Sequence, residues 1–203
     1  MSNTITSIVN NFEINKLKNE FNNNKKLFEI VKTYIKKKNF ILYGGYALNL
    51  ILPKKFRFYK DYTQADYDCY SYSAKDDIII LAKKLKKLKY ALIKVKLAKH
   101  ENTFKLYVGT LNILDLTQLD INIYNIYLKI HNYEKHNNLL IHYTEDFKII
   151  PLYLIKRNIH YELARPEGSY YRWEKIYNRY ILLDKVYFTK HFNELRSNCK
   201  LNI

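Results

Sequence analysis

The sequence has few cysteines, the residues that form the disulfides of small secreted proteins and bind zinc. It contains 2 cysteines in 203 residues, and Cys69 and Cys199 lie too far apart in the chain to suggest a disulfide framework or a zinc site. No apolar stretch is long enough to span a bilayer, and the first residues lack the basic-then-apolar layout of a signal peptide. We therefore expect a soluble, intracellular protein in a reducing compartment, with Cys69 as a buried free thiol.

Acidic residues are also scarce. The chain has 19 Asp and Glu against 35 Lys and Arg, which gives a formal net charge of +16. A field of this sign favours polyanions, above all nucleic acid, and predicts binding that weakens as salt rises. AT-rich coding bias explains abundant Asn and Ile but not so large an excess of positive charge. Because 48% of the residues are apolar and 16% are aromatic, the composition argues against wholesale disorder, and we expect one domain with a real core, or such a domain with an appendage.

Glycine is rare as well, and two of the 4 glycines form a single pair, Gly44-Gly45. The pair directly follows an apolar run at residues 40–42, which predicts a short buried strand that ends in a glycine turn. Glycines in such a turn allow the backbone to come close to a phosphate group. A short apolar helix is expected at residues 46–51, ended by Pro53.

Two carboxylates follow the glycine pair, in Asp66-Tyr67-Asp68. We predict a strand over residues 66–72, in which side chains two apart point to the same face and are separated by roughly 6.6–6.8 Å along the axis. Two carboxylates in this arrangement can share a divalent cation. Together with the glycine turn, they indicate metal-assisted chemistry on a nucleotide.

A third carboxylate is expected from a neighbouring strand, and Asp115 is the candidate. It lies between Leu114 and Leu116 in a predicted strand, where a carboxylate is costly unless it is paired or coordinates a metal. Asp120 is the alternative third ligand, but we expect it to cap the helix that follows.

Hydrophobic periodicity predicts the remaining elements. Helices are expected at residues 12–38, 76–89, 151–164 and 170–188, and strands at 93–97, 104–108 and 111–117. This order predicts an α+β fold, a small mixed sheet flanked by helices with a helical C-terminal tail. We divide the chain into an N-terminal helical segment (1–38), a core that carries the glycine pair and the acids (39–120) and a mainly helical C-terminal part (121–203).

Three cationic residues in the last predicted helix, Arg172, Lys175 and Arg179, follow spacings of three, four and seven and share one helix face. This face is either an exposed basic stripe, with Trp173 and Tyr177 packed in the core, or a contact for phosphate groups. The residues leave both interpretations open.

The glycine pair, the acidic pair and the third acid together resemble the pattern of the DNA polymerase beta-like nucleotidyltransferase superfamily. Within it, the chain is similar to the catalytic subunits of poly(A) polymerases from large cytoplasmic DNA viruses. Three segments carry this resemblance: LYGGYALN at 42–49, DYDCYS at 66–71 and RPEGSYYRWEKIYNR at 165–179.

The resemblance implies a nucleotidyltransferase-type sheet and a metal-dependent enzyme that adds AMP from ATP to an RNA 3′ end during mRNA processing. It implies two Mg²⁺ or Mn²⁺ ions and a partner or processivity subunit, no membrane, and a location in the host cytoplasm or the virion. The predicted catalytic and metal-binding residues are Asp66, Asp68 and Asp115, and the predicted nucleotide-binding residues are Gly44, Gly45, Arg172 and Lys175.

Two other functions are compatible with the sequence. The shortness of the chain fits a catalytically silent RNA-binding or scaffold subunit that keeps the fold. The same chemistry also fits nucleotide transfer onto a protein acceptor, although the net charge of +16 favours RNA.

Overall fold

The computed structural model describes residues 2–188 except 62, 64, 141–142, 144–145 and 166–169, with side chains from residue 11 onward. The helices in this part of the chain are α1 (Ser2–Lys38), α2 (Gly44–Ile51), α3 (Ala74–Lys87), α4 (Ile121–His136), α5 (Leu152–Ala164) and α6 (Trp173–Leu183). The strands are β1 (Ile41–Tyr43), β2 (Tyr67–Ser71), β3 (Ile93–Leu97), β4 (Thr103–Val108), β5 (Leu111–Gln118) and β6 (Lys148–Ile149). Short helical turns are η1 (Lys54–Phe56), η2 (Tyr170–Arg172) and η3 (Asp184–Phe188).

The strands form one mixed sheet in the order β3-β4-β5-β2-β1-β6. β2 runs parallel to β5 and β1 parallel to β6, whereas the other neighbours are antiparallel. This arrangement confirms the predicted α+β fold with a small mixed sheet and flanking helices. β6 was not predicted, because two residues are too few to show a period of their own.

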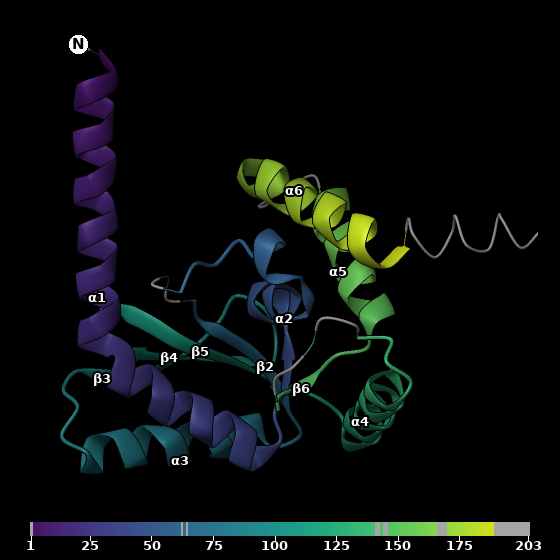
Figure 1. The fold of residues 1–203 in the computed structure, drawn as a ribbon. Coiled ribbons are helices and arrows are strands. Elements are labelled where there is room, and N and C mark those ends of the chain that lie inside the picture. Colours follow the sequence, from purple (N-terminus) through teal and green to yellow (C-terminus); the bar gives the residue numbers. More distant parts are fainter. Residues whose placement is uncertain are drawn as a thin grey trace, which may run out of the picture.

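Two helices cover one face of the sheet (Figure 1). The C-terminal half of α1 lies beside α3, and both bury apolar residues four apart along the helix. In α1 these are Val31 and Ile35, and in α3 they are Leu81 and Leu85, all fully buried. On the other side of the sheet lie α2, α5 and α6, while α4 lies beside the β6 edge (Figure 1).

The first helix is longer than the segment predicted at 12–38. Its N-terminal half projects away from the sheet (Figure 1). Within its described side chains, full burial begins at Leu27, and Phe12 is 72% exposed. Because long helices in water depend on tertiary packing, the buried C-terminal half is what anchors α1. No helix in the described part of the chain is both long and apolar enough to cross a membrane.

The second helix begins on the glycine pair itself, not after it as predicted. Gly44 adopts φ of +67° where β1 passes into α2, a backbone conformation that glycine reaches without steric penalty. At the other end, Arg57 donates hydrogen bonds of 3.1 Å to the carbonyl oxygens of Leu52 and Leu50. These bonds hold the segment after Pro53 against the C-terminus of α2.

Candidate active site

The three predicted carboxylates meet on the face of the sheet opposite α3. Asp68 lies directly across from Asp115 in the parallel pair of β2 and β5, and Asp66 immediately precedes β2. One carboxylate oxygen from each residue lies within 4.8 Å of the others. Asp66 and Asp68 are half-buried and Asp115 is buried. The structure therefore brings together three oxygen ligands of the kind that Mg²⁺ and Mn²⁺ prefer.

The charges of this cluster repel one another. Burial, reinforced by the carboxylates of Asp66 and Asp115, raises the pKa of Asp68 to about 7 against the opposing charges of Lys105 and Arg172. Partly buried carboxylates at such short range cannot all ionise cheaply. A divalent cation would favour the ionised forms, so the donor set and its electrostatics fit a metal site.

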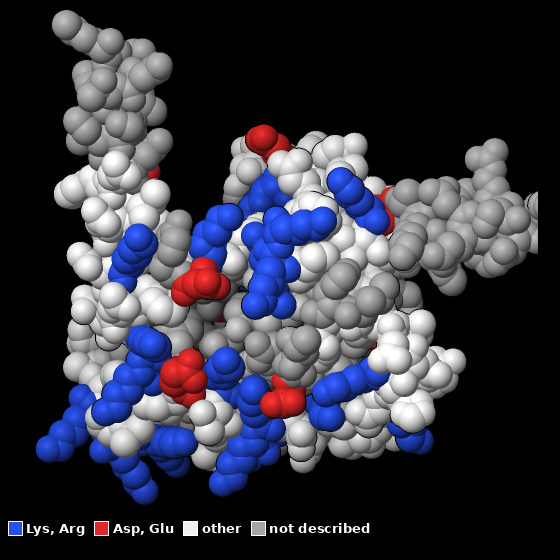
Figure 2. All heavy atoms as spheres, viewed as in Figure 1, with Lys and Arg blue, Asp and Glu red and all other residues white. Residues whose placement is uncertain are grey.

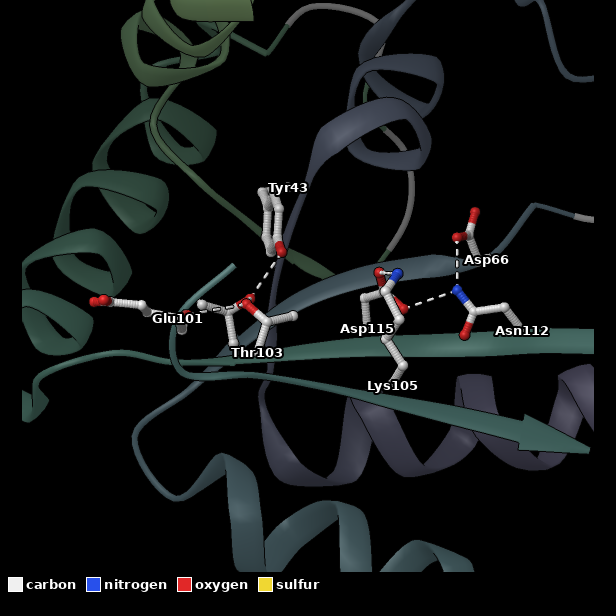
Figure 3. Close-up of polar contacts among 8 residues, drawn as sticks. Tyr43, Asp66, Glu101, Thr103, Lys105, Asn112 and Asp115 are labelled. Atoms are coloured by element: carbon white, nitrogen blue, oxygen red, sulfur yellow. Dashed lines mark hydrogen bonds and ion pairs between the residues drawn. The ribbon is translucent and has the colours of Figure 1, made fainter. Parts of the chain in front are cut away.

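Two polar residues that the sequence analysis missed hold the cluster in place (Figure 3). Asn112 donates from Nδ2 to Asp115 Oδ1 at 2.8 Å and to Asp66 Oδ2 at 3.1 Å. Lys105 forms an ion pair with Asp115 across the β4–β5 ladder. Asn112 reaches this face because the ladder shifts register between Leu106 and Tyr107.

The alternative third ligand, Asp120, is not part of the cluster. Its Oδ1 accepts hydrogen bonds from the backbone N–H groups of Asn122 at 2.8 Å and Ile123 at 3.4 Å, which confirms that it caps α4. Cys69 is a buried free thiol, as predicted. Burial raises its pKa well above the usual range, which favours the neutral thiol.

Gly44 allows the backbone to approach the acidic cluster. A Cβ atom at this position would lie 2.4 Å from Oδ2 of Asp68, so a larger residue would displace the carboxylate. The helix that starts here has Tyr43 as its N-cap residue, without a side-chain cap hydrogen bond. The first backbone N–H groups of α2 therefore have no side-chain acceptor at the cap, which suits an anion.

Gly45 makes room for a buried arginine. A Cβ atom there would lie 2.8 Å from the Tyr59 hydroxyl and 3.0 Å from Nη1 of Arg179. Arg179 is 8% exposed, donates to the Tyr59 hydroxyl at 3.2 Å and lies 4.5 Å over the ring of Phe58. In the described part of the chain, no carboxylate lies within 4.0 Å of its guanidinium group. Because a buried charge without a partner is costly, this arginine is suited to bind an anion.

A cavity of about 530 Å³ opens beside Arg179, between α6 and the side chains of Phe58, Tyr59 and Thr63. It is lined by Phe58, Tyr59, Thr63, Glu174, Lys175, Asn178, Arg179 and Leu182. Lys175 and Arg172 are exposed at this side of α6. Burial lowers the pKa of Lys175, and the charges of Arg179 and Arg172 lower it further. The cavity therefore carries a concentrated positive charge next to the glycine pair.

The structure bears on the two interpretations of the cationic face of α6, an exposed basic stripe or a contact for phosphate groups. Trp173 is 38% exposed and Tyr177 is 54% exposed, so these two residues do not pack in the core as the exposed-stripe interpretation required. The helical spacing of the three cations already grouped Arg179 with Arg172 and Lys175, but nothing in the sequence showed that, of the three, Arg179 is the one buried against Gly45. Residues 166–169 of the family-like segment, and Cys199, lie outside the described residues.

Known proteins match this chain both in sequence and in fold. Residues 29–166 match the model of the family described as "Poly(A) polymerase catalytic subunit". The "Putative poly(A) polymerase catalytic subunit" of Acanthamoeba polyphaga mimivirus is 27% identical over 171 residues, which are 83% of this chain and 27% of that protein. The crystal structure of the Megavirus polyadenylate synthase superposes with a TM-score of 0.75 at 21% identity, over 91% of this chain and 36% of that one. The chain thus has the same fold and spans well under half the length of either relative.

Proposed function

Because this chain belongs to the family of poly(A) polymerase catalytic subunits, we propose that it is a metal-dependent nucleotidyltransferase that adds AMP from ATP to an RNA 3′ end. The family match confirms the resemblance noted in the sequence. The observation that carries the proposal is the convergence of three carboxylates within 4.8 Å, beside the uncapped start of α2. The positive net charge and the family's description as a catalytic subunit support an RNA acceptor and a partner or processivity subunit.

Asp66, Asp68 and Asp115 would hold two Mg²⁺ or Mn²⁺ ions. Such ions, when bound, neutralise charge on the attacking and leaving oxygens of a phosphoryl transfer. Asn112 would keep Asp66 and Asp115 oriented through its two hydrogen bonds. Asp115 is the most buried of the three acids, and its ion pair with Lys105 fixes it against the sheet.

The triphosphate would lie against the first turn of α2. The backbone N–H groups at Gly44 and Gly45 would donate to phosphate oxygens, as helix N-termini do. Arg179 would supply a planar pair of donors to the same group, held in position by Tyr59. Arg172 and Lys175 would contribute positive charge from the exposed rim.

The test is extension of a short RNA primer with labelled ATP and Mg²⁺ or Mn²⁺. We expect wild type to extend the primer and the double variant Asp66→Ala with Asp68→Ala to lose extension. Asp146→Ala is the matched control, because the Asp146 side chain is 84% exposed and lies outside the cluster. Absence of extension with any primer, or extension that survives the double substitution, would contradict the proposal.

The same assay separates the alternatives. Label on a protein band with none on RNA would indicate a protein acceptor, and salt-dependent RNA binding without turnover would indicate a silent RNA-binding subunit.

The variant Arg179→Met tests the proposed contact with the triphosphate. We expect the KM for ATP to rise about tenfold or more, since hydrogen bonds to charged groups contribute about 1.5–3 kcal/mol. Arg165→Met, which removes the same charge from an exposed residue, should leave the KM unchanged.

A further inference from the structure

A row of side chains crosses the sheet from its β3 edge to the carboxylates. Lys96 of β3 lies opposite Lys105 of β4, and Lys105 lies opposite Asp115 of β5. Asp115 in turn lies opposite Asp68 of β2. Residues directly opposite one another in a sheet project from the same face. Lys96 and Lys105 therefore share the face that carries the acidic cluster.

A second row runs alongside the first. Lys94 lies opposite Tyr107, and Tyr107 lies opposite Asn112, whose amide contacts two of the carboxylates. The Nζ atom of Lys96 lies 5.6 Å from the centre of the Tyr107 ring. Both lysines of β3 are exposed and Tyr107 is half-buried. The edge of the sheet thus presents cations and an aromatic ring that lead directly to the candidate site.

This arrangement has an electrostatic cost in the free protein. Like charges directly opposite each other destabilise a sheet, and Lys96 faces Lys105. Asp115 offsets the charge of Lys105. Among the residues that the structure describes, however, no carboxylate lies within 4.0 Å of Lys94 or Lys96. Figure 2 shows that Lys and Arg side chains outnumber Asp and Glu side chains over this view of the molecule. A polyanion bound against Lys94 and Lys96 would offset the repulsion.

We propose that Lys94, Lys96 and Tyr107 form a binding surface for the single-stranded 3′ segment of the acceptor RNA. The lysines contact phosphate groups, and the exposed part of the Tyr107 ring stacks on a base. β3 is three strand positions from β2, roughly 14 Å at about 4.8 Å per strand, so a short single strand bound here reaches the carboxylates. This inference rests on the proposed function for its direction, since the 3′ end must lie at the acidic cluster.

The surface can be tested by RNA binding alone. A short 5′-labelled oligoadenylate is titrated with the full chain by fluorescence anisotropy at several salt concentrations, without ATP or divalent metal. The test variant is Lys94→Met with Lys96→Met. The control is Lys83→Met with Lys87→Met, which removes the same charge from exposed residues of α3, on the opposite side of the sheet.

We expect the β3 variant to bind RNA about tenfold more weakly than wild type at low salt. Its slope of log affinity against log salt should fall by about 1.4, because each phosphate contact on a single strand contributes about 0.7. The α3 control should keep the wild-type slope. Tyr107→Leu keeps apolar bulk but removes stacking, so it should weaken binding about tenfold with an unchanged slope. Circular dichroism of each variant checks that it is folded.

A folded β3 variant with the affinity and slope of the α3 control would overturn the proposal. Because the measurement requires no turnover, failure of primer extension would contradict the proposed function and leave this surface standing. Conversely, normal extension with unchanged RNA binding in the β3 variant would preserve the proposed function and place the acceptor elsewhere. If the β3 variant binds RNA normally but no longer transfers label to a protein acceptor, that result would likewise overturn an RNA surface and indicate a protein partner.

Discussion

At the scale of single residues, Gly44 and Gly109 form a natural matched pair. Their φ angles are +67° and +62°, so alanine adds a similar backbone strain at each, about 1–2 kcal/mol. A Cβ atom at Gly44 would lie 2.4 Å from Oδ2 of Asp68, whereas at Gly109 nothing lies within 4 Å. We expect Gly44→Ala to reduce AMP transfer by about 100-fold, as misplacement of a reacting group by about 1 Å can do.

The control separates strain from geometry. Gly109→Ala carries the backbone strain without the clash, so it should lower the unfolding temperature by no more than Gly44→Ala does and leave primer extension at the wild-type rate. Thermal unfolding and extension kinetics of both variants provide the comparison. Equal activity of the two alanine variants would show that the close approach of Gly44 to Asp68 has no functional role.

The residues that the sequence could and could not identify differ in what fixes their position. Asp66, Asp68 and Asp115 were predicted together because strand periodicity and the cost of a carboxylate between leucines are local properties, and the structure brings them together. Asn112 was missed because it reaches the site through a register shift between β4 and β5. Arg179 was grouped by its spacing but not distinguished, because its burial depends on Gly45 and Tyr59, which are distant in the chain.

At the scale of elements, periodicity predicted most helices and strands but not how they pair. The sheet order places β6 beside β1 although more than a hundred residues separate them in sequence, and no local pattern records such a contact. The start of α2 was placed two residues late, because glycine has a low helix propensity. In the structure the helix begins at these positions. They are glycines because close contacts with Asp68 and Arg179 leave no room for a side chain.

The junction of α4 and β6 should make the stability of the fold depend on pH. Nδ1 of His131 accepts a hydrogen bond from the backbone N–H of Ile149 at 3.3 Å. Burial, together with the charges of Lys148 and Lys135, lowers the pKa of His131 to about 4. The folded state therefore keeps a neutral imidazole, while the unfolded chain takes up a proton near pH 6.5. The stabilisation is complete above pH 6.5 and is lost as pH falls toward 4.

The measurement is the free energy of unfolding of wild type and His131→Asn from pH 8 to pH 4. An asparagine side-chain oxygen can accept the Ile149 hydrogen bond without titrating, so wild type should lose about 3 kcal/mol more than the variant over this range. His136→Asn, at an exposed position of the same helix, should follow wild type. Parallel curves for wild type and His131→Asn would contradict the assignment.

At the scale of the whole molecule, a positively charged chain contains a local cluster of negative charge. The chain carries a formal net charge of +16, which repels itself and favours an anionic partner. Within this positive field, one face of the sheet gathers three carboxylates whose mutual repulsion and burial raise the pKa of Asp68 to about 7. The fold thus retains a local instability where the proposed metal ions would bind, and stability is exchanged for function at this point.

This opposition predicts that one substitution stabilises the metal-free protein and removes its response to metal. Because the pKa of Asp68 is raised, its ionisation lowers the free energy of unfolding by nothing below about pH 4, where the carboxyl is protonated in both states. The full loss of stability is reached above about pH 7. In EDTA at pH 8, Asp68→Asn should therefore unfold at a higher temperature than wild type. Its free energy of unfolding should be larger by about 2 kcal/mol after allowing for solvent screening. Mg²⁺ should raise the unfolding temperature of wild type by mass action but not that of the variant.

Asp146→Asn, at a side chain that is 84% exposed, removes the same charge outside the cluster and should behave as wild type in both conditions. Thermal unfolding at pH 5 adds a second check, because the advantage of Asp68→Asn should shrink there as Asp68 of wild type becomes protonated. A wild-type protein that ignores Mg²⁺ at pH 8, or an Asp68→Asn variant that still responds to it, would mean that the carboxylates do not form the metal site. The acidic cluster would then be a strained structural feature, and the nucleotidyltransferase proposal would lose its central observation.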